Sequence, residues 1–109
     1  MNSVIQIIEP KGILDSTKTA NFQRQIEQCI ESGVDNILID FTNVTFMDSS
    51  GLGALVKALK TLEAANVQLF LCSINEQIRM LFELTSMDKF FTILSDREEF
   101  NQYVQQGKV

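Results

Sequence analysis

The stretch FMDSSGLGAL gathers one aspartate, two adjacent serines and two glycines within ten residues. It follows a short apolar segment typical of a strand and opens a stripe of leucines at helical spacing. A strand-to-helix junction exposes backbone N–H groups that attract anions, and hydroxyl and carboxylate groups there could serve catalysis, ligand binding, capping or modification. The residues in question are Asp48, Ser49, Ser50, Gly51 and Gly53.

Catalysis is the weakest interpretation of this stretch. A nucleophile elbow needs Gly-x-Ser-x-Gly, but Met47 stands two positions before Ser49, and Asp48 stands two before Ser50. The chain has no histidine, which excludes a Ser-His-acid triad. Asp15 and Asp48 could form a carboxylate pair, yet no general acid, oxyanion hole or metal-ligand cluster accompanies them. We therefore expect no enzyme, no metal and no cofactor.

Dinucleotide binding is a weak alternative. GLGALV begins Gly-x-Gly after a strand, but the third glycine of the fingerprint is replaced by Val56. The following strand ends in Cys72 and Ser73, where the fingerprint has an acid for the ribose. A nucleotide-binding or constitutive scaffold function stays open on these residues.

Capping and phosphorylation are the two stronger interpretations. Aspartate and serine are preferred helix N-caps, and Gly51 and Gly53 would let the first turn approach a neighbouring strand. One cap suffices for one helix, so a second exposed serine is available for modification. A phosphate at a helix N-terminus meets unsatisfied N–H groups and adds about −1.5 to −2 charge. Beside Asp15 and Asp48, it would repel an acidic or apolar partner.

The elements around the stretch follow from periodicity and punctuation. A hairpin through Pro10 and Gly12 is expected to join the first two strands, with Gly33 ending the first helix. The N-cap of that helix is expected at Ser16, Thr17 or Thr19. The predicted strands are 4–8, 12–14, 36–41, 67–72 and 90–94, and the predicted helices are 16–32, 50–64, one marked by Ile78, Leu81 and Phe82, and one marked by Phe100, Tyr103 and Val104.

This order, β-β-α-β-α-β-α-β-α, predicts an α/β fold with a mixed, largely parallel sheet of about five strands. Parallel strands have their carboxyl ends at one edge, where ligands and partners bind. We therefore expect the loops that carry Asp15, Asp48 to Ser50, and Ser73 with Asn75 to converge.

Length and charge narrow the function further. The chain has 109 residues and a formal net charge of −5, which suits a single domain over 1–109 and argues against nucleic acid as a partner. No apolar run approaches the roughly 20 residues of a membrane span, and the start lacks a secretion signal. We expect a cytoplasmic protein without a membrane partner, in which Cys29 and Cys72 are buried apolar residues.

The sequence resembles the anti-sigma factor antagonists, the single-domain STAS proteins of bacterial partner-switching pathways. FMDSSGLGALVKALKTL is similar to the family's signature, and KGILDSTKTANF to its early G-x-L-D segment. LCSINEQIRMLFELTSMDKFFTIL is similar to the family's strand, helix and last strand. The resemblance implies a STAS fold, a mixed sheet with four or five helices.

The resemblance also implies a switch. In the family the serine before the glycine of D-S-S-G is phosphorylated by an anti-sigma factor with serine kinase activity, and a PP2C-type phosphatase resets it. The phosphorylated position here would be Ser50, favoured over Ser49. Unmodified protein would bind the anti-sigma factor, and phosphorylation would release it. The flanking docking residues would be Asp15, Asp48, Ser49, Gly51, Leu52 and Gly53. A STAS switch that controls a different output is the alternative.

Several positions depart from the pattern or leave two interpretations open. Lys18 and Thr19 replace the family's Thr-Ala, and Lys18 would either pair with a phosphate or stay solvated. Thr85-Ser86-Met87 replaces the family's Ser-Gly after the third helix. Phe46 and Met47 would be either core residues or partner anchors. Leu52, Leu55 and Val56 should mostly face the sheet, with Lys57 on their flank.

Overall fold

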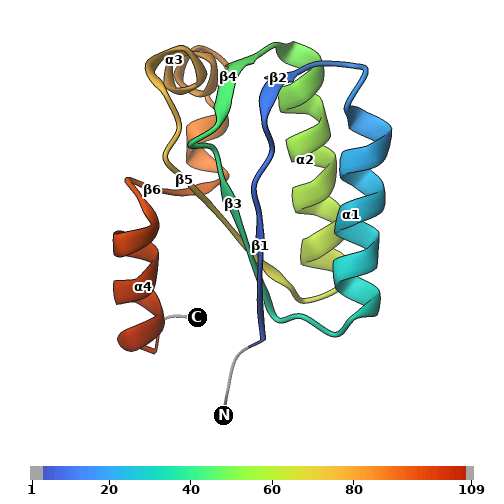
Figure 1. Ribbon diagram of the computed structural model, residues 1–109, viewed down its shortest axis with the longest axis vertical. Coiled ribbons are helices and arrows are strands. Elements are labelled where there is room, and N and C mark those ends of the chain that lie inside the picture. Colours follow the sequence, from blue (N-terminus) through green and yellow to red (C-terminus); the bar gives the residue numbers. More distant parts are fainter. Residues whose placement is uncertain (1–3, 108–109) are drawn as a thin grey trace.

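The computed structural model of the protein describes residues 4–107 (Figure 1). Its strands are β1 (Ile5–Ile8), β2 (Gly12–Leu14), β3 (Asn36–Asp40), β4 (Val44–Met47), β5 (Gln68–Cys72) and β6 (Thr92–Leu94). Its helices are α1 (Thr19–Glu31), α2 (Ser49–Ala64), α3 (Glu76–Leu84), the 3-10 turn η1 (Met87–Lys89) and α4 (Arg97–Gln105). The predicted α/β class, the largely parallel sheet and the helices are confirmed.

The strands form two sheets. One has four parallel strands in the order β1-β3-β5-β6, and the other is a parallel pair of β2 and β4. The predicted hairpin between the first two strands is therefore wrong. The chain leaves β1 at Glu9, turns through Gly12 at a φ of 74°, and pairs with residues 44–47 instead. The Gly12 amide donates to the Asn43 carbonyl at 2.9 Å, which begins the second sheet.

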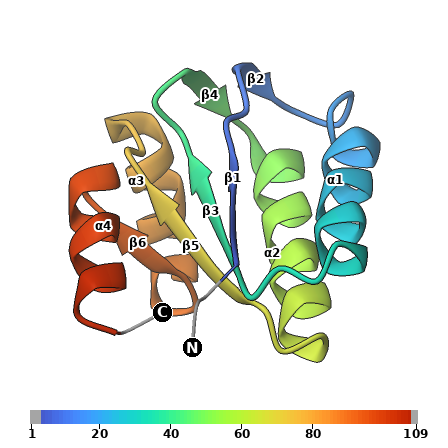
Figure 2. The same cartoon turned by 60° about the horizontal axis from the view of Figure 1, so that its bottom comes forward.

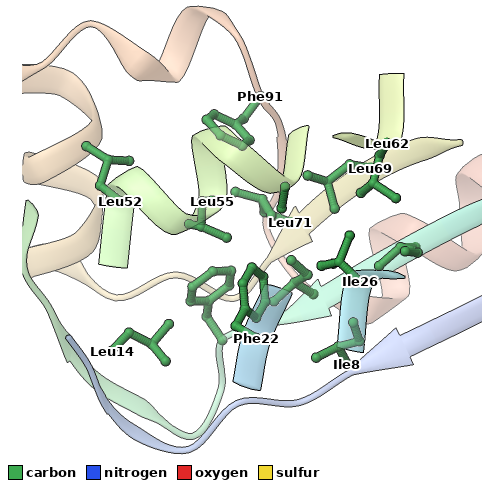
Figure 3. Close-up of a cluster of buried hydrophobic side chains, with 14 of the residues drawn as sticks. Ile8, Leu14, Phe22, Ile26, Leu52, Leu55, Leu62, Leu69, Leu71 and Phe91 are labelled. Atoms are coloured by element: carbon green, nitrogen blue, oxygen red, sulfur yellow. The ribbon is translucent and has the colours of Figure 1, made fainter. Parts of the chain in front are cut away.

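The core lies on both faces of the four-stranded sheet (Figure 2). Helices α1 and α2 cover one face and α4 covers the other. Helix α3 packs against β4 and η1 and adds Ile78 and Phe82 to the larger cluster. All five residues of β3 are buried, as predicted for a strand covered on both sides. Ile37 and Ile39 enter the larger cluster, while Leu38 packs with Phe70 and Phe100 under α4. Figure 3 shows Phe22, Leu55 and Leu71 meeting in the larger cluster.

The first helix begins later than predicted, at Thr19, and its N-cap position is Lys18, without a side-chain cap bond. The cap candidates are used elsewhere. The Thr17 amide and hydroxyl both donate to Asp15 Oδ1, at 3.0 and 2.5 Å, and Thr19 donates to the Ser16 carbonyl. This Asx turn holds residues 15–18 outside the helix. Gly33 ends the helix as predicted, at a φ of 80°.

Three further predictions change in detail. The last strand begins at Thr92 rather than residue 90, because Phe90 is exposed and follows the 3-10 turn. Ser86 takes a left-handed conformation with a φ of 58°, which settles the path of the loop after α3. Cys72 is buried as predicted, but Cys29 is only half-buried; burial raises the pKa of both thiols.

Candidate functional site

The two aspartates singled out from the sequence leave neighbouring strands at the same level. Leu14 of β2 pairs with Met47 of β4, so Asp15 and Asp48 each follow a paired residue. The Asp48 amide donates to the Leu14 carbonyl at 3.3 Å, which ties the two loops together. The third predicted loop contacts the same strand nearer its start, because the Asn75 side-chain amide donates to the Val44 and Thr45 carbonyls. The expected convergence is confirmed for the loops that carry Asp15 and Asp48.

Helix α2 begins at this edge with one cap and two unused hydroxyls. The Gly51 amide donates to Asp48 Oδ1 at 3.0 Å, so Asp48 is the N-cap. Ser49 and Ser50 follow as the first two helical residues, and both are exposed. Within residues 4–107 neither serine hydroxyl makes a hydrogen bond. Capping thus accounts for Asp48 and leaves both serines available.

The two glycines of the motif do different things. Gly51 is buried, and a Cβ built on it would overlap the Leu14 carbonyl oxygen and lie 2.7 Å from Met47 Cγ. A side chain at this position would push α2 away from β2. Gly53 is exposed, and a Cβ there would meet no atom within 4 Å. The expected close approach to a strand therefore applies to Gly51 alone.

An apolar pair lies on the outer face of the small sheet. Ile13 pairs with Phe46 across β2 and β4, and their side chains are 49% and 45% exposed. Met47 points the opposite way and is fully buried. The structure thus separates the two residues that the sequence left undecided: Met47 is core, and Phe46 is surface. Leu52 and Leu55 are buried and Val56 is partly buried, as predicted, while Lys57 is exposed.

Helix α3 holds the other side of β4 through a residue that the sequence analysis missed. Gln77 accepts from the Met47 amide at 3.0 Å and donates to the Met47 carbonyl at 2.8 Å. Asn75 caps α3 by accepting from the Ile78 amide, in addition to its bonds to β4. Nothing in the spacing of Gln77 indicated this, since one glutamine in a first helical turn is ordinarily solvated.

Comparison with known proteins fits this architecture. The STAS domain family matches residues 2–100. The anti-sigma-B factor antagonist of Staphylococcus aureus is 30% identical over 70% of this chain and 70% of its own length. The chain belongs to the STAS-domain anti-sigma factor antagonist family.

Solved structures of STAS proteins share the fold. The unphosphorylated anti-sigma factor antagonist SpoIIAA is 25% identical, with a TM-score of 0.71 over 96% of this chain and 94% of SpoIIAA. The phosphorylated Bacillus SpoIIAA superposes with a TM-score of 0.69 at 24% identity, over 94% of each chain. A sulfate transporter family protein from Wolinella succinogenes reaches 0.83 at 14% identity, covering 96% of this chain and 90% of its own. The STAS fold alone therefore does not fix an output.

Local hydrogen bonds favour the charged form of the Asp15 carboxyl in this STAS domain. At Asp15 the hydroxyl and then the amide of Thr17 hold the pKa of the carboxyl below its usual value, so it is anionic at neutral pH.

No group of three or more His, Cys, Asp or Glu residues suited to a metal occurs among residues 4–107. No helix in that range is long and apolar enough to cross a bilayer.

The cavity below the edge is too small for a nucleotide. It has a volume of about 10 Å³ and lies between Leu14, Asp15, Lys18, Phe22 and Gly51. This is roughly the volume that one water molecule needs, whereas small-molecule sites span about 300–1,000 Å³. This cavity therefore has no room for a small-molecule ligand.

A second polar cluster went unnoticed in the sequence. Arg97 Nε lies 2.6 Å from Asp40 Oδ2, and its Nη2 lies 2.7 Å from Glu9 Oε1. Burial acts to raise the pKa of the Asp40 carboxyl, but hydrogen bonds from the Thr42 hydroxyl and amide and from Arg97 outweigh it. The net pKa of Asp40 lies below its ordinary value. The cluster fastens α4 to β1 and β3.

Proposed function

We propose that the chain is a cytoplasmic anti-sigma factor antagonist, switched by phosphorylation of Ser50 and without catalytic activity of its own. The observation that carries the proposal is the first turn of α2. Asp48 already caps the helix, so the two exposed serine hydroxyls serve no structural bond within the described chain. A kinase can reach them without unfolding the domain.

Ser50 is favoured over Ser49 by the family pattern, which modifies the serine directly before the glycine. The solved phosphorylated and unphosphorylated forms of SpoIIAA support a phosphorylation switch in this family. A phosphate on Ser50 would carry about −1.5 to −2 charge at pH 7. The helix N-terminus tolerates that charge, while Asp15 and Asp48 make the surface more anionic. The fold would persist and the surface would change.

The surface that the phosphate would alter is apolar at its centre. Ile13 and Phe46 lie side by side on the small sheet, at the end where α2 begins. An anti-sigma factor that covers these side chains would remove their apolar area from water and would also shield Ser50 from solvent. Introducing a phosphate there would leave a charge desolvated against an apolar patch, which is unfavourable unless the charge is paired. Release of the partner follows.

The remainder of the cycle follows from the family. The unmodified chain would bind an anti-sigma factor with serine kinase activity and displace the sigma factor that it holds. Phosphorylation would free the anti-sigma factor, and a PP2C-type phosphatase would restore binding. Asp15, Asp48, Ser49, Gly51, Leu52 and Gly53 would shape or flank the docking surface, with Leu52 and Gly51 acting from buried positions.

The test combines phosphorylation with binding. The purified chain is incubated with ATP and the anti-sigma factor kinase of the same organism, and the modified residue is mapped by peptide mass spectrometry. We expect one phosphate, on Ser50, in the wild type and in Ser49→Ala, and none in Ser50→Ala. We also expect Ser50→Asp to bind the kinase at least tenfold more weakly, which is about 1.4 kcal/mol. Equal binding by Ser50→Asp and wild type would refute the mechanism.

A second candidate function is supported by one observation: a sulfate transporter family protein shares this fold at a TM-score of 0.83. The same phosphorylation switch could therefore control an output other than a sigma factor. Deleting the gene and measuring sigma-factor-dependent transcription separates the two. A scaffold function without a switch instead predicts that Ser50→Asp and Ser50→Ala bind every partner alike.

A further inference from the structure

Lys18 lies beside the proposed phosphorylation site and is only partly used by the fold. Its Nζ donates to the Ile13 carbonyl at 2.8 Å. An ammonium group has three protons to donate. Within residues 4–107 this is the hydrogen bond that the Lys18 ammonium makes, and the side chain is exposed. The two remaining N–H groups of this positively charged ammonium therefore face solvent.

The position of that charge follows from contacts along β2. The Leu14 carbonyl presses against Gly51, and Ile13, whose carbonyl binds Lys18, is the preceding residue. Lys18 and Gly51 also border the same cavity of about 10 Å³. Ser50 directly precedes Gly51. Lys18 at the start of α1 and Gly51 in the first turn of α2 therefore lie at the same junction, and Lys18 is near enough to Asp15 to help lower the pKa of that carboxyl.

The neighbouring acids are already satisfied, which leaves the lysine available. Asp15 accepts from the Thr17 amide and hydroxyl, and Asp48 accepts from the Gly51 amide. Neither carboxylate forms a salt bridge with Lys18 in the described chain. A phosphate would bring three acceptor oxygens and up to two negative charges into a spot flanked by Asp15 and Asp48. The charge-assisted bond it needs is the kind that Lys18 can supply.

We propose that Lys18 is the counter-ion of a phosphate on Ser50 and binds it through the ammonium protons that Ile13 leaves unused. This inference rests on the proposed function for its biological use, although its chemistry requires only that the phosphate be present. Lys18 would stabilise the modified form without moving α2, and it would hold the phosphate against the domain. It is a positioning residue for the switched state.

The experiment installs phosphoserine at residue 50 during translation, so no kinase is needed. The second ionisation of the phosphate, near pH 6, is followed by the pH dependence of its ³¹P chemical shift. The charged groups that face the phosphate are Lys18, Asp15 and Asp48. Lys18→Gln should raise the phosphate pKa by about half a unit, because the dianion loses its cation. Lys18→Arg should restore the wild-type value.

Lys57→Gln is the matched control, because Lys57 is an exposed lysine seven residues beyond Ser50 on the same helix, roughly 10 Å along its axis. It should leave the phosphate pKa within about 0.1 unit of wild type. An unchanged pKa in Lys18→Gln, or an equal shift in Lys57→Gln, would overturn the assignment. Because the phosphate is built in, either result is independent of whether a kinase modifies Ser50. Failure of the kinase test alone would instead refute the proposed function.

Discussion

Two clusters of polar residues stand at the carboxyl ends of strands, and they are built differently. Around Arg97, every charge has a partner: Asp40 is buried and accepts from Thr42 and Arg97, and Glu9 completes the set. Around Ser50, the carboxylates are satisfied by nearby backbone, the serine hydroxyls are exposed, and Ile13 and Phe46 face solvent. The first cluster stabilises the fold, and the second leaves groups available to a partner.

The largest loss of stability is expected at Gly51, where the cluster around Ser50 depends on close packing between α2 and β2. Gly51→Ala places a methyl group against the Leu14 carbonyl, which is backbone and cannot rotate away. We expect a loss of about 3 kcal/mol in the free energy of unfolding, measured in urea. Gly53→Ala is the control, because a methyl group there meets nothing. It should stabilise α2 by up to about 1 kcal/mol. Equal effects of the two substitutions would contradict this packing.

A smaller loss of stability should follow from removing Arg97 from its cluster with Asp40 and Glu9. Arg97→Met leaves the Asp40 carboxylate buried without its cation and should cost about 2 kcal/mol at pH 7. Since the pKa of Asp40 is lowered in the folded chain, its charged form stabilises the fold above its ordinary pKa of about 3.9 and loses that contribution at lower pH. The difference between Arg97→Met and wild type should therefore shrink below about pH 4.

The control for this cluster is Glu9→Gln. Glu9 pairs with the same arginine but is half-exposed, so its removal should cost less than about 0.5 kcal/mol. Urea unfolding of the three proteins at pH 7 and pH 3.5 measures both differences. A pH-independent cost of Arg97→Met would show that lost packing of its aliphatic stem, rather than charge pairing, explains the substitution.

The smallest effect on stability, and a selective effect on binding, is expected at Phe46. Phe46→Ser should change the free energy of unfolding by less than about 1 kcal/mol because the ring is half-exposed. Its binding to the anti-sigma factor should fall about tenfold. Met80→Ser is the matched control, because Met80 is 52% exposed and lies on α3 rather than on the small sheet. Isothermal titration of both variants tests whether the loss is confined to the surface near Ser50.

The elements with a regular period could be predicted from sequence, and the irregular strand could not. Helix α2 and the fully buried β3 follow directly from the spacing of their apolar residues. Strand β4 gave no period-two signal because its register with β2 shifts between Gly12 and Ile13. That bulge leaves Thr45 and Phe46 both exposed between buried Val44 and Met47. Missing β4 led to the wrong hairpin.

The candidate site was predictable where chemistry is local and unpredictable where it depends on distant residues. The cap at Asp48 lies three residues from the amide that it accepts, so the motif contains it. The bonds of Gln77 to Met47 and of Arg97 to Asp40 span 30 and 57 residues. Only the fold brings those side chains together, and no local pattern marks a solitary glutamine or arginine for such contacts.

The hydrogen bonds of Gln77 also decide how a partner can approach. Gln77 and Asn75 occupy the outer edge of β4, and Lys18 occupies the Ile13 carbonyl on the outer edge of β2. Both open edges of this small sheet are thus blocked by side chains, which protects it from strand addition. An extended peptide has no row of backbone groups to extend here. A partner that binds at this end of the molecule must contact side chains on the face of the sheet, where a single phosphate can change whether it binds.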